Sequence, residues 1–264
     1  MNFPLLFLSV GLALLIAVAA YLLHSLKASG AVAAFFVIAP SLYLGSWGSF
    51  TVLVSSFALI AVVGRLTRRK THALSHDLHE KTGARDAIQV LANGAPATLT
   101  AVLYFVTGNA GFLFAYAATI AEALSDSLAS DVGVLSKKPP RDALSFRPVS
   151  RGISGGVSLL GTLSALAGCV AVAALTVPFL GFDLWKTALL VVIPFCGVYL
   201  DSILGARLQC RRVCRVCGKA TEKKLHCVEE TAVTGGIRCL NNDGVNLSSN
   251  LVTAAVASLI FIFI

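Results

Sequence analysis

Three acidic side chains lie in a part of the sequence that is otherwise almost entirely apolar. Glu122, Asp126 and Asp131 follow the apolar run 111–121. Glu122 and Asp126 are four residues apart, so on a helix they share one face, while Asp131 joins them only if the helix ends or bends near Ser130. An ionised Asp at the centre of a membrane helix costs about 3 kcal/mol, so such groups are rare and mark functional sites. Carboxylates are also ligands that Mg²⁺ takes together with phosphate oxygens and water.

The rest of the sequence has the composition of a membrane protein. Hydrophobic residues make up 56% of the 264 residues and charged residues only 13%, which excludes an ordinary soluble globular protein. A membrane span needs about 20 residues that are mostly apolar. The expected spans are 4–23, 31–44, 47–64, 86–107, 111–130, 153–178, 184–205 and 245–263. We therefore predict an all-α, polytopic membrane helix bundle of eight spans, in which the second span is the shortest.

The positive charges predict how the chain crosses the bilayer. Lys and Arg collect in the cytosolic loops of membrane proteins. Here every Lys and Arg except Lys186 falls in the turn 24–30 or in the loops 65–85, 132–151 and 206–243. These segments are predicted to be cytosolic, which places both termini on the opposite side of the membrane. The net charge of +8 follows from this asymmetry, so we expect a lipid bilayer and no nucleic acid as partner.

The second half of the chain contains an internal repeat. Asp126-Ser127-Leu128 recurs as Asp201-Ser202-Ile203, and Gly156-Val157-Ser158-Leu159 recurs as Gly244-Val245-Asn246-Leu247. Two helical hairpins of the same orientation would bring Asp126 and Asp201 toward a common axis near the cytosolic side. The matches are short and use common membrane residues, so coincidence is the alternative.

A glycine-rich segment, 151–158, precedes the sixth expected span. Free backbone N–H groups and the positive end of the helix dipole favour an anion at a helix start, and glycine lets a phosphate approach closely. The alternative is that Gly152 and Gly156 form a small-residue packing face between helices. Basic groups nearby supply positive charge, and uncharged amides farther along the chain can hydrogen-bond phosphate or ribose or serve as interhelical contacts. The expected nucleotide and phosphate ligands are Lys137, Lys138, Arg147, Arg151, Ser154, Gly155, Gly156, Gln209, Asn242, Asn246 and Asn250.

A second group of polar residues precedes and enters the fourth expected span. Arg85, Gln89 and Asn93 are spaced by four, so on a helix they form one polar stripe that descends into the membrane. Together with Glu80 and Lys81 they are the expected site for a substrate headgroup. The alternative is interfacial snorkelling by the cations, with Asn93 as a helix-packing contact.

Five of the seven cysteines fall in the loop 206–243. Cys214 and Cys217 have the Cys-x-x-Cys spacing of a zinc site, but a second Cys-x-x-Cys is absent, so structural zinc and no metal are equal alternatives. A bound zinc ion would stiffen the loop rather than perform chemistry. The first-choice ligands are Cys214, Cys217, Cys227 and Cys239, with Cys210 or His226 as substitutes.

Five segments together resemble the transmembrane protein 19 family, which includes the plant phytyl-phosphate kinase of tocopherol biosynthesis. They are 80–93, 126–133, 152–159, 201–206 and 242–246. The chain departs from that family at Asp131, where the family commonly has Glu, and at Leu128, where it commonly has Trp. The aspartate-containing run and the glycine loop are also similar to the nucleotide motif of CTP-dependent dolichol and phytol kinases.

The resemblance implies transfer of a phosphoryl group from a nucleoside triphosphate, CTP as first choice, to phytyl, farnesyl or geranylgeranyl monophosphate. Asp126, Asp131 and Asp201 would hold Mg²⁺ and be catalytic, on the cytosolic side. In this interpretation one integral membrane domain, 1–264, consists of N-terminal spans, 1–64, and a catalytic core, 65–264, with 206–243 inserted. A secondary transporter of an anionic or lipid-linked solute and a scaffold are the alternatives. The sequence leaves the isoprenoid length and the oligomeric state open.

Overall fold

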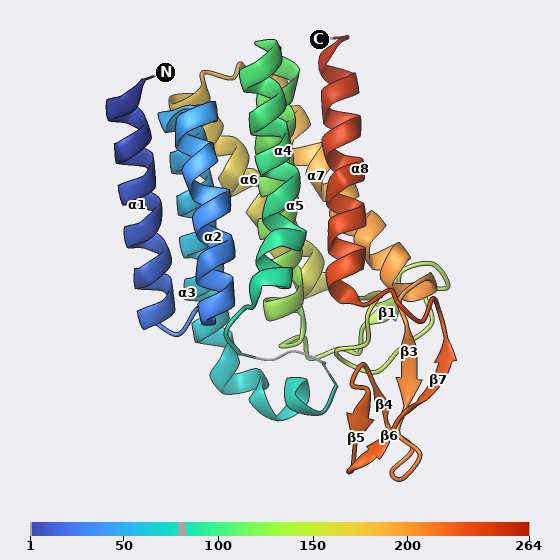
Figure 1. Ribbon diagram of the computed structural model, residues 1–264. Helices are drawn as coiled ribbons and strands as arrows, with labels where there is room; N and C mark the ends of the chain where they lie inside the picture. The colour runs from blue at the N-terminus through green and yellow to red at the C-terminus, as the bar shows by residue number, and fades with distance from the viewer. Residues whose placement is uncertain (1, 79–82, 264) are drawn as a thin grey trace.

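The computed structural model describes the backbone of residues 2–78 and 83–263 and the side chains of residues 2–67 and 83–263. Within these residues, eight helices are long and apolar enough to cross a membrane (Figure 1). The helices are α1 (Phe3–Leu22), α2 (Ala28–Pro40) with the π-helical turn η1 (Ser41–Gly45), α3 (Trp47–Leu78), α4 (Ala87–Thr107), α5 (Ala110–Gly133), α6 (Leu159–Leu180), α7 (Leu184–Arg207) and α8 (Asn242–Phe261). The predicted all-α membrane bundle is confirmed.

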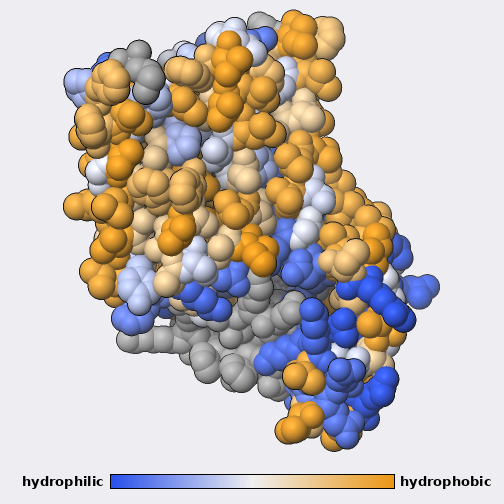
Figure 2. Space-filling model, in the orientation of Figure 1, coloured by the Kyte–Doolittle hydropathy of each residue, from blue (hydrophilic) through white to orange (hydrophobic). Residues whose placement is uncertain are grey.

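The two ends of the bundle differ in chemistry. Both termini lie at one end, and the long polar loops lie at the other (Figure 1). On the face in Figure 2, apolar side chains cover most of the helices, and hydrophilic side chains gather over the loops at the opposite end from the termini. This distribution is that of a multi-pass membrane protein. Which end faces the cytosol stays a prediction from the positive charges.

Helix α5 runs through the middle of the bundle. Every side chain from Phe114 to Ser125 is buried, and α5 contacts α3, α4, α6, α7 and α8. Alanines such as Ala117 and Ala121 keep its surface small, so the neighbouring backbones approach closely. The helix that carries Glu122 and Asp126 is therefore surrounded by other helices rather than by lipid.

Capping side chains set where the helices begin. Asp86, Ser158, Asp183 and Asn241 each accept a hydrogen bond from the backbone N–H three residues farther on. The sixth span was expected to begin at residue 153, but α6 begins only after the Ser158 cap. The reason lies in the preceding loop, where two glycines adopt left-handed backbone conformations that a helix does not allow.

Short strands organise the polar loops, which the sequence did not predict. In the first loop, β1 (Arg141–Asp142) pairs with β2 (Gly156–Val157). In the second, β3 (Arg211–Val213) lies between its two partner strands, and a separate hairpin follows β4 along the chain. These remaining strands are β4 (Ala220–Thr221), β5 (Leu225–His226), β6 (Glu229–Glu230) and β7 (Ala232–Gly235).

The predicted parallel repeat is present as two helical hairpins, α5–α6 and α7–α8. Helices α5 and α7 both run toward the end of the bundle that carries the polar loops (Figure 1). The return helices α6 and α8 are each capped there, by Ser158 and Asn241. The two hairpins therefore have the same orientation, with the cysteine-rich loop inserted in the second.

The orientation of the protein can be tested with an exposed native thiol. Cys239 lies on the polar-loop end, and Lys186 lies near the start of α7 at the other end. Because the positive charges predict cytosolic loops, a membrane-impermeant maleimide should modify Cys239 only from the cytosolic side of sealed vesicles. A Lys186→Cys protein should be modified at residue 186 only from the opposite side. Mass spectrometry of the two peptides distinguishes the outcomes, and the reverse pattern would overturn the orientation.

Close packing of α3 against α6 gives a prediction about stability. A Cβ atom on Gly48 would collide with the backbone carbonyl of Phe179, and backbone cannot yield as a flexible side chain can. Gly48→Ala should therefore lower the free energy of unfolding by about 1–3 kcal/mol, measured as a lower thermal midpoint in detergent. Gly11→Ala is the matched control, because a Cβ there meets nothing within 4 Å. Equal midpoints for both variants would contradict the packing.

Candidate functional site

A polar cavity lies at the loop end of the bundle, bordered by α5, α6, α7 and the glycine-rich segment 151–158. Two carboxylates from different hairpins, Asp126 and Asp201, line this acidic cavity. The polar residues that line it are Asp126, Ser130, Arg151, Ser154, Ser158, Thr162, Tyr199, Asp201, Ser202, Glu222 and Asn242. The structure thus brings the two repeat aspartates to one cavity, as the repeat predicted.

Asp201 is held in place by side chains of α8. It is only 8% exposed, and the hydroxyl of Ser249 donates a hydrogen bond of 3.1 Å to its Oδ2. With its amide nitrogen turned toward the carboxylate, Asn246 donates to the same oxygen at 3.1 Å and to the carbonyl of Asn242 at 3.0 Å. Asn246, which was predicted to bind phosphate, therefore donates a hydrogen bond that holds the Asp201 carboxylate in place.

The glycine-rich segment packs tightly on the end of α7. Gly155 has a φ of +79°, and a Cβ there would collide with Ala206. The hydroxyl of Ser154 lies against Gly205 and donates a hydrogen bond of 2.7 Å to Oε1 of Gln209. Close packing on α7 thus involves Gly155, whereas the packing alternative from the sequence concerned Gly152 and Gly156. The segment as a whole still lines the acidic cavity, so its backbone is held at the cavity wall by that packing.

The predicted phosphate ligands separate into two groups. Arg151, Ser154, Gly155, Gly156 and Asn242 line the acidic cavity.

The other group lies away from the cavity surface. Lys137, Lys138 and Arg147 are exposed on the polar loops and are not among the lining residues. Gln209 is 2% exposed and connects two loops, since its Nε2 donates to Oε1 of Glu222 at 2.7 Å. Asn250 is buried within the bundle, where its Oδ1 has no hydrogen-bond partner among the residues that the structure describes.

Asp131 lies beside α3 and does not line the acidic cavity. A Cβ atom on Gly64 of α3 would lie 3.2 Å from Oδ2 of Asp131. Asp131 is also not among the residues that line the cavity with Asp126 and Asp201. The helix continues as far as Gly133, so it does not end near Ser130 as joining the three acids would require.

A second, apolar cavity lies on the other side of α5, toward α1, α2, α3 and α4. Its apolar lining residues are Ile16, Ala34, Val37, Ile38, Leu53, Val54, Phe57, Ile60, Val90, Gly94, Ile120, Ala123 and Leu124. Four polar side chains line the same cavity, namely Ser56, Arg85, Gln89 and Asn93. The predicted polar stripe therefore faces a single cavity, whereas Glu80 and Lys81 lie outside the described residues.

Arg85 lies between the two cavities and is held on both sides. Its backbone forms a parallel bridge with the turn between α1 and α2, through hydrogen bonds of 3.1 Å to the carbonyl of Ser25 and 2.9 Å from the N–H of Lys27. Its guanidinium donates at 3.2 Å to the hydroxyl of Ser127, the residue next to Asp126. The cation is thus placed beside the helix that separates the cavities.

Gln89 and Asn93 have structural roles in addition to lining the cavity. Oε1 of Gln89 accepts from the N–H of Asp86 at 3.2 Å, which completes a capping box at the start of α4. Nδ2 of Asn93 donates to the carbonyl of Gln89 at 3.0 Å. Part of the hydrogen-bonding capacity of both amides is therefore used within α4.

Two acids were not among the predicted ligands. Glu222, in the cysteine-rich loop, lines the acidic cavity, and its place there depends on a loop path that the sequence does not reveal. Glu122 is 2% exposed, lies beside Gly197 of α7, and its Oε2 has no partner within the described part of the chain. The spacing of four residues between Glu122 and Asp126 was the signal that could have placed Glu122 among the predicted ligands.

The cysteine cluster differs from the first-choice set. Cys214, Cys217, His226 and Cys227 form a group in which one possible ligand atom from each lies within 4.8 Å of all the others. Cys239 is exposed and outside this group, so the prediction of Cys239 as a ligand was wrong. His226, one of the two predicted substitutes, takes its place. The physical reason is that the hairpin β5–β6 carries His226 and Cys227 to the first two cysteines, whereas Cys239 follows β7.

Comparison with known proteins agrees with the architecture. The family model described as integral membrane protein DUF92 matches residues 11–254. Protein PGR of Arabidopsis thaliana is 31% identical over 281 residues, covering 95% of this chain and 94% of the relative. An uncharacterized membrane protein of Methanocaldococcus jannaschii is 26% identical over 227 residues, covering 83% and 79%. No solved structure matches. With the family model covering nearly all of its membrane helices, this chain belongs to the DUF92 family of integral membrane proteins.

Proposed function

We propose that this protein is an isoprenyl-phosphate kinase. It would transfer a phosphoryl group from a nucleoside triphosphate, CTP as first choice, to an isoprenyl monophosphate such as phytyl, farnesyl or geranylgeranyl phosphate. The products would be the isoprenyl diphosphate and the nucleoside diphosphate. The observation that carries the proposal is the pair of cavities on either side of α5, one lined by Asp126 and Asp201 and the other almost wholly apolar.

The acidic cavity has the groups that a magnesium-bound triphosphate requires. Mg²⁺ binds through one or two carboxylates plus phosphate oxygens, and the carboxylates of Asp126 and Asp201 fit that role. The segment 151–158 supplies backbone N–H groups and Ser154, and Ser158 and Gly161 lie at the start of α6, where the helix dipole favours an anion. Bound there, the metal would neutralise charge on the transferred phosphoryl group.

The apolar cavity has the groups that an isoprenyl phosphate requires. Aliphatic and aromatic side chains from five helices would surround the hydrocarbon tail, because burial of apolar surface away from water is favourable. Arg85 lies at the end of this cavity nearest the polar loops and beside Ser127. Its guanidinium is suited to the acceptor phosphate, since planar N–H donors match phosphate oxygens. The acceptor would then lie next to the residue that follows Asp126.

The chemistry needs no strong general base. A phosphate oxygen of the acceptor, already anionic at neutral pH, attacks the terminal phosphorus of the triphosphate. The bond between that phosphorus and the bridging oxygen breaks, and the nucleoside diphosphate leaves with that oxygen. Catalysis of this kind depends on positioning and on stabilisation of charge. Arg85 would orient the acceptor, and Asn246 and Ser249 would keep Asp201 in place.

Removal of one acid tests the assignment. Asp126→Asn and Asp201→Asn should each lower radiolabel transfer from CTP or ATP to geranylgeranyl phosphate by about 100-fold or more, because charge stabilisation of the transition state is lost. Asp131→Asn is the control on the same helix, since its side chain faces α3, and it should keep most of the activity. Full activity of Asp126→Asn would refute the proposal.

The same variants separate the kinase from a transporter. A transporter would show uptake of an isoprenoid-independent solute into liposomes, abolished by Asp201→Asn, with no label transferred to any isoprenyl phosphate. That pattern would replace the proposed function by the transport alternative.

The apolar cavity should set which chain lengths are accepted. Ile38 lines it, ten residues along α2 from the loop end and so about 15 Å into the bundle. Ile38→Phe should shorten the space and lower the ratio of kcat/KM for geranylgeranyl phosphate over geranyl phosphate by about tenfold. Val32→Phe, on the exposed side of the same helix, should leave the ratio unchanged. An unchanged ratio in Ile38→Phe would place the tail elsewhere.

A further inference from the structure

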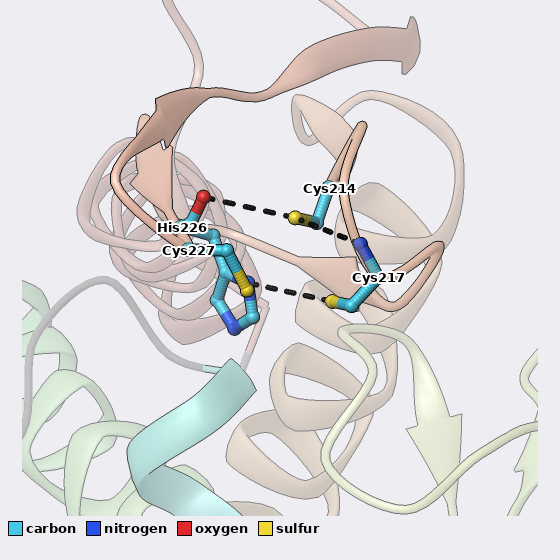
Figure 3. Close-up of side chains that lie close together, drawn as sticks. All are labelled: Cys214, Cys217, His226 and Cys227. Atoms are coloured by element: carbon cyan, nitrogen blue, oxygen red, sulfur yellow. Dashed lines mark hydrogen bonds between the residues drawn. The ribbon is translucent and has the colours of Figure 1, made fainter.

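Four side chains with the chemistry of zinc ligands meet in the cysteine-rich loop. Cys214, Cys217, His226 and Cys227 come from two separate turns, yet one ligand atom of each lies within 4.8 Å of the others (Figure 3). Figure 3 shows the pair Cys214 and Cys217 on one turn facing the pair His226 and Cys227 on another. Three thiols and one imidazole form a set that selects zinc over the hard cations, since soft thiolate ligands favour it.

The first turn is built as a metal-binding knuckle. Cys214 directly follows the strand β3. Its carbonyl accepts from the N–H of Gly218 at 3.0 Å, while its own N–H donates to the carbonyl of Lys219 at 2.9 Å. Gly218 has a φ of +70°, which closes the turn. The N–H of Cys217 donates to Sγ of Cys214 at 3.5 Å. Two sulfur atoms are thus presented on the same side of a rigid turn.

The Cys214 thiol is buried and receives a backbone hydrogen bond within this turn. Its side chain is 1% exposed, and the backbone N–H of Cys217 is directed at its sulfur. The thiolate is the form of cysteine that binds a metal. The backbone therefore directs a hydrogen-bond donor at a sulfur that would bind the metal.

The second turn is strained in a way that brings its two ligands together. Consecutive side chains of a strand point to opposite faces, but Cys227 and Val228 have φ values of +52° and +68° and form the two-residue loop between β5 and β6. Such loops favour Asn-Gly, and a β-branched residue with positive φ is unusual. The side chain of Val228 is fully exposed, so its packing does not explain the conformation.

Distances within the cluster approach those around a tetrahedral ion. Nδ1 of His226 lies 3.6 Å from Sγ of Cys217 and 3.2 Å from Sγ of Cys227. With Zn–S bonds of about 2.3 Å and Zn–N bonds of about 2.0 Å, neighbouring ligand atoms of a tetrahedral site are about 3.5–3.8 Å apart. The three cysteines are not joined by disulfides. All four positions of such an ion would be filled by protein, which is typical of structural zinc.

We infer that Cys214, Cys217, His226 and Cys227 bind one structural Zn²⁺ and that this ion holds the wall of the acidic cavity formed by the cysteine-rich loop. Zinc binding by these four residues does not depend on the proposed kinase activity. The effect of the ion on the cavity wall concerns the cavity that is proposed to bind the nucleotide, and it is tested separately.

The path from the ligands to the cavity is short. The knuckle joins β3 to β4, and Glu222 follows β4 directly and lines the acidic cavity. Glu222 accepts a hydrogen bond from Gln209 at 2.7 Å, and Gln209 accepts one from Ser154 at 2.7 Å. One continuous set of contacts therefore links the zinc cluster with the glycine-rich segment. The ion would position Glu222 and Gln209 and would take no part in chemistry.

Metal content is the first test. The full chain, without a polyhistidine tag, is expressed with zinc in the medium, purified in detergent and analysed by elemental mass spectrometry. We expect one zinc per chain. Cys217→Ser and Cys227→Ser should lose at least 80% of it, by the loss of one ligand of four. Cys239→Ser, in the same loop but outside the cluster, should keep it. Exchange with Co²⁺ should give the visible absorption of a tetrahedral thiolate site.

The positioning role has its own readout. Hydrogen–deuterium exchange of residues 219–231 and of the segment 152–158 should be faster in Cys217→Ser than in the wild type, and unchanged in Cys239→Ser. Wild-type protein without bound zinc, recovery of the cluster as a disulfide, or equal zinc loss from Cys239→Ser would overturn the site. Faster exchange confined to 219–231 would overturn the link to the cavity. Neither result depends on whether label is transferred to an isoprenyl phosphate.

Discussion

Carboxylates inside an apolar helix bundle must be compensated, and the arrangement around Asp201 shows how this protein does so. Ser249 and Asn246 of α8 both donate to its Oδ2, which requires α7 and α8 to meet at this level. Asp126 reaches the same cavity only because α5 passes through the middle of the bundle, with small side chains along its length. Burial of one charged group therefore constrains the packing of three helices, because an ion without partners in a low-dielectric interior is costly.

The central helix separates two environments of opposite character. On one side, acids, a glycine-rich segment and a helix start surround a polar cavity, and on the other, side chains of five helices surround an apolar one. Arg85 and Ser127 form the contact nearest the boundary. A substrate that is half hydrocarbon and half phosphate matches this division. The headgroup would meet the polar cavity near Arg85 and Ser127, while its tail stays among apolar side chains.

Much of this architecture could be predicted from the sequence, because apolar length and positive charge are strong signals. The spans, the repeat and the convergence of Asp126 and Asp201 all follow from such patterns. The direction of one side chain is harder to predict, and Asp131 faces Gly64 although it lies only five residues after Asp126. Contacts set by loop paths could not be predicted either: His226 joins the cysteines in place of Cys239, and Glu222 reaches the acidic cavity.

The bridge between Leu26 and Arg85 has a consequence for the modularity of the chain. The sequence predicts three N-terminal spans, 1–64, without candidate site residues and a core, 65–264, that contains all of the candidate site residues. Yet the backbone on either side of Leu26 is what pairs with Arg85, and a side chain on Gly30 would collide with the Arg85 carbonyl. The first hairpin, α1 and α2, thus holds Arg85 in place, and Arg85 is the only described arginine that lines the apolar cavity. Shortened versions of this protein that begin after α2 would leave that arginine unsupported, so the first hairpin and the core form one structural unit.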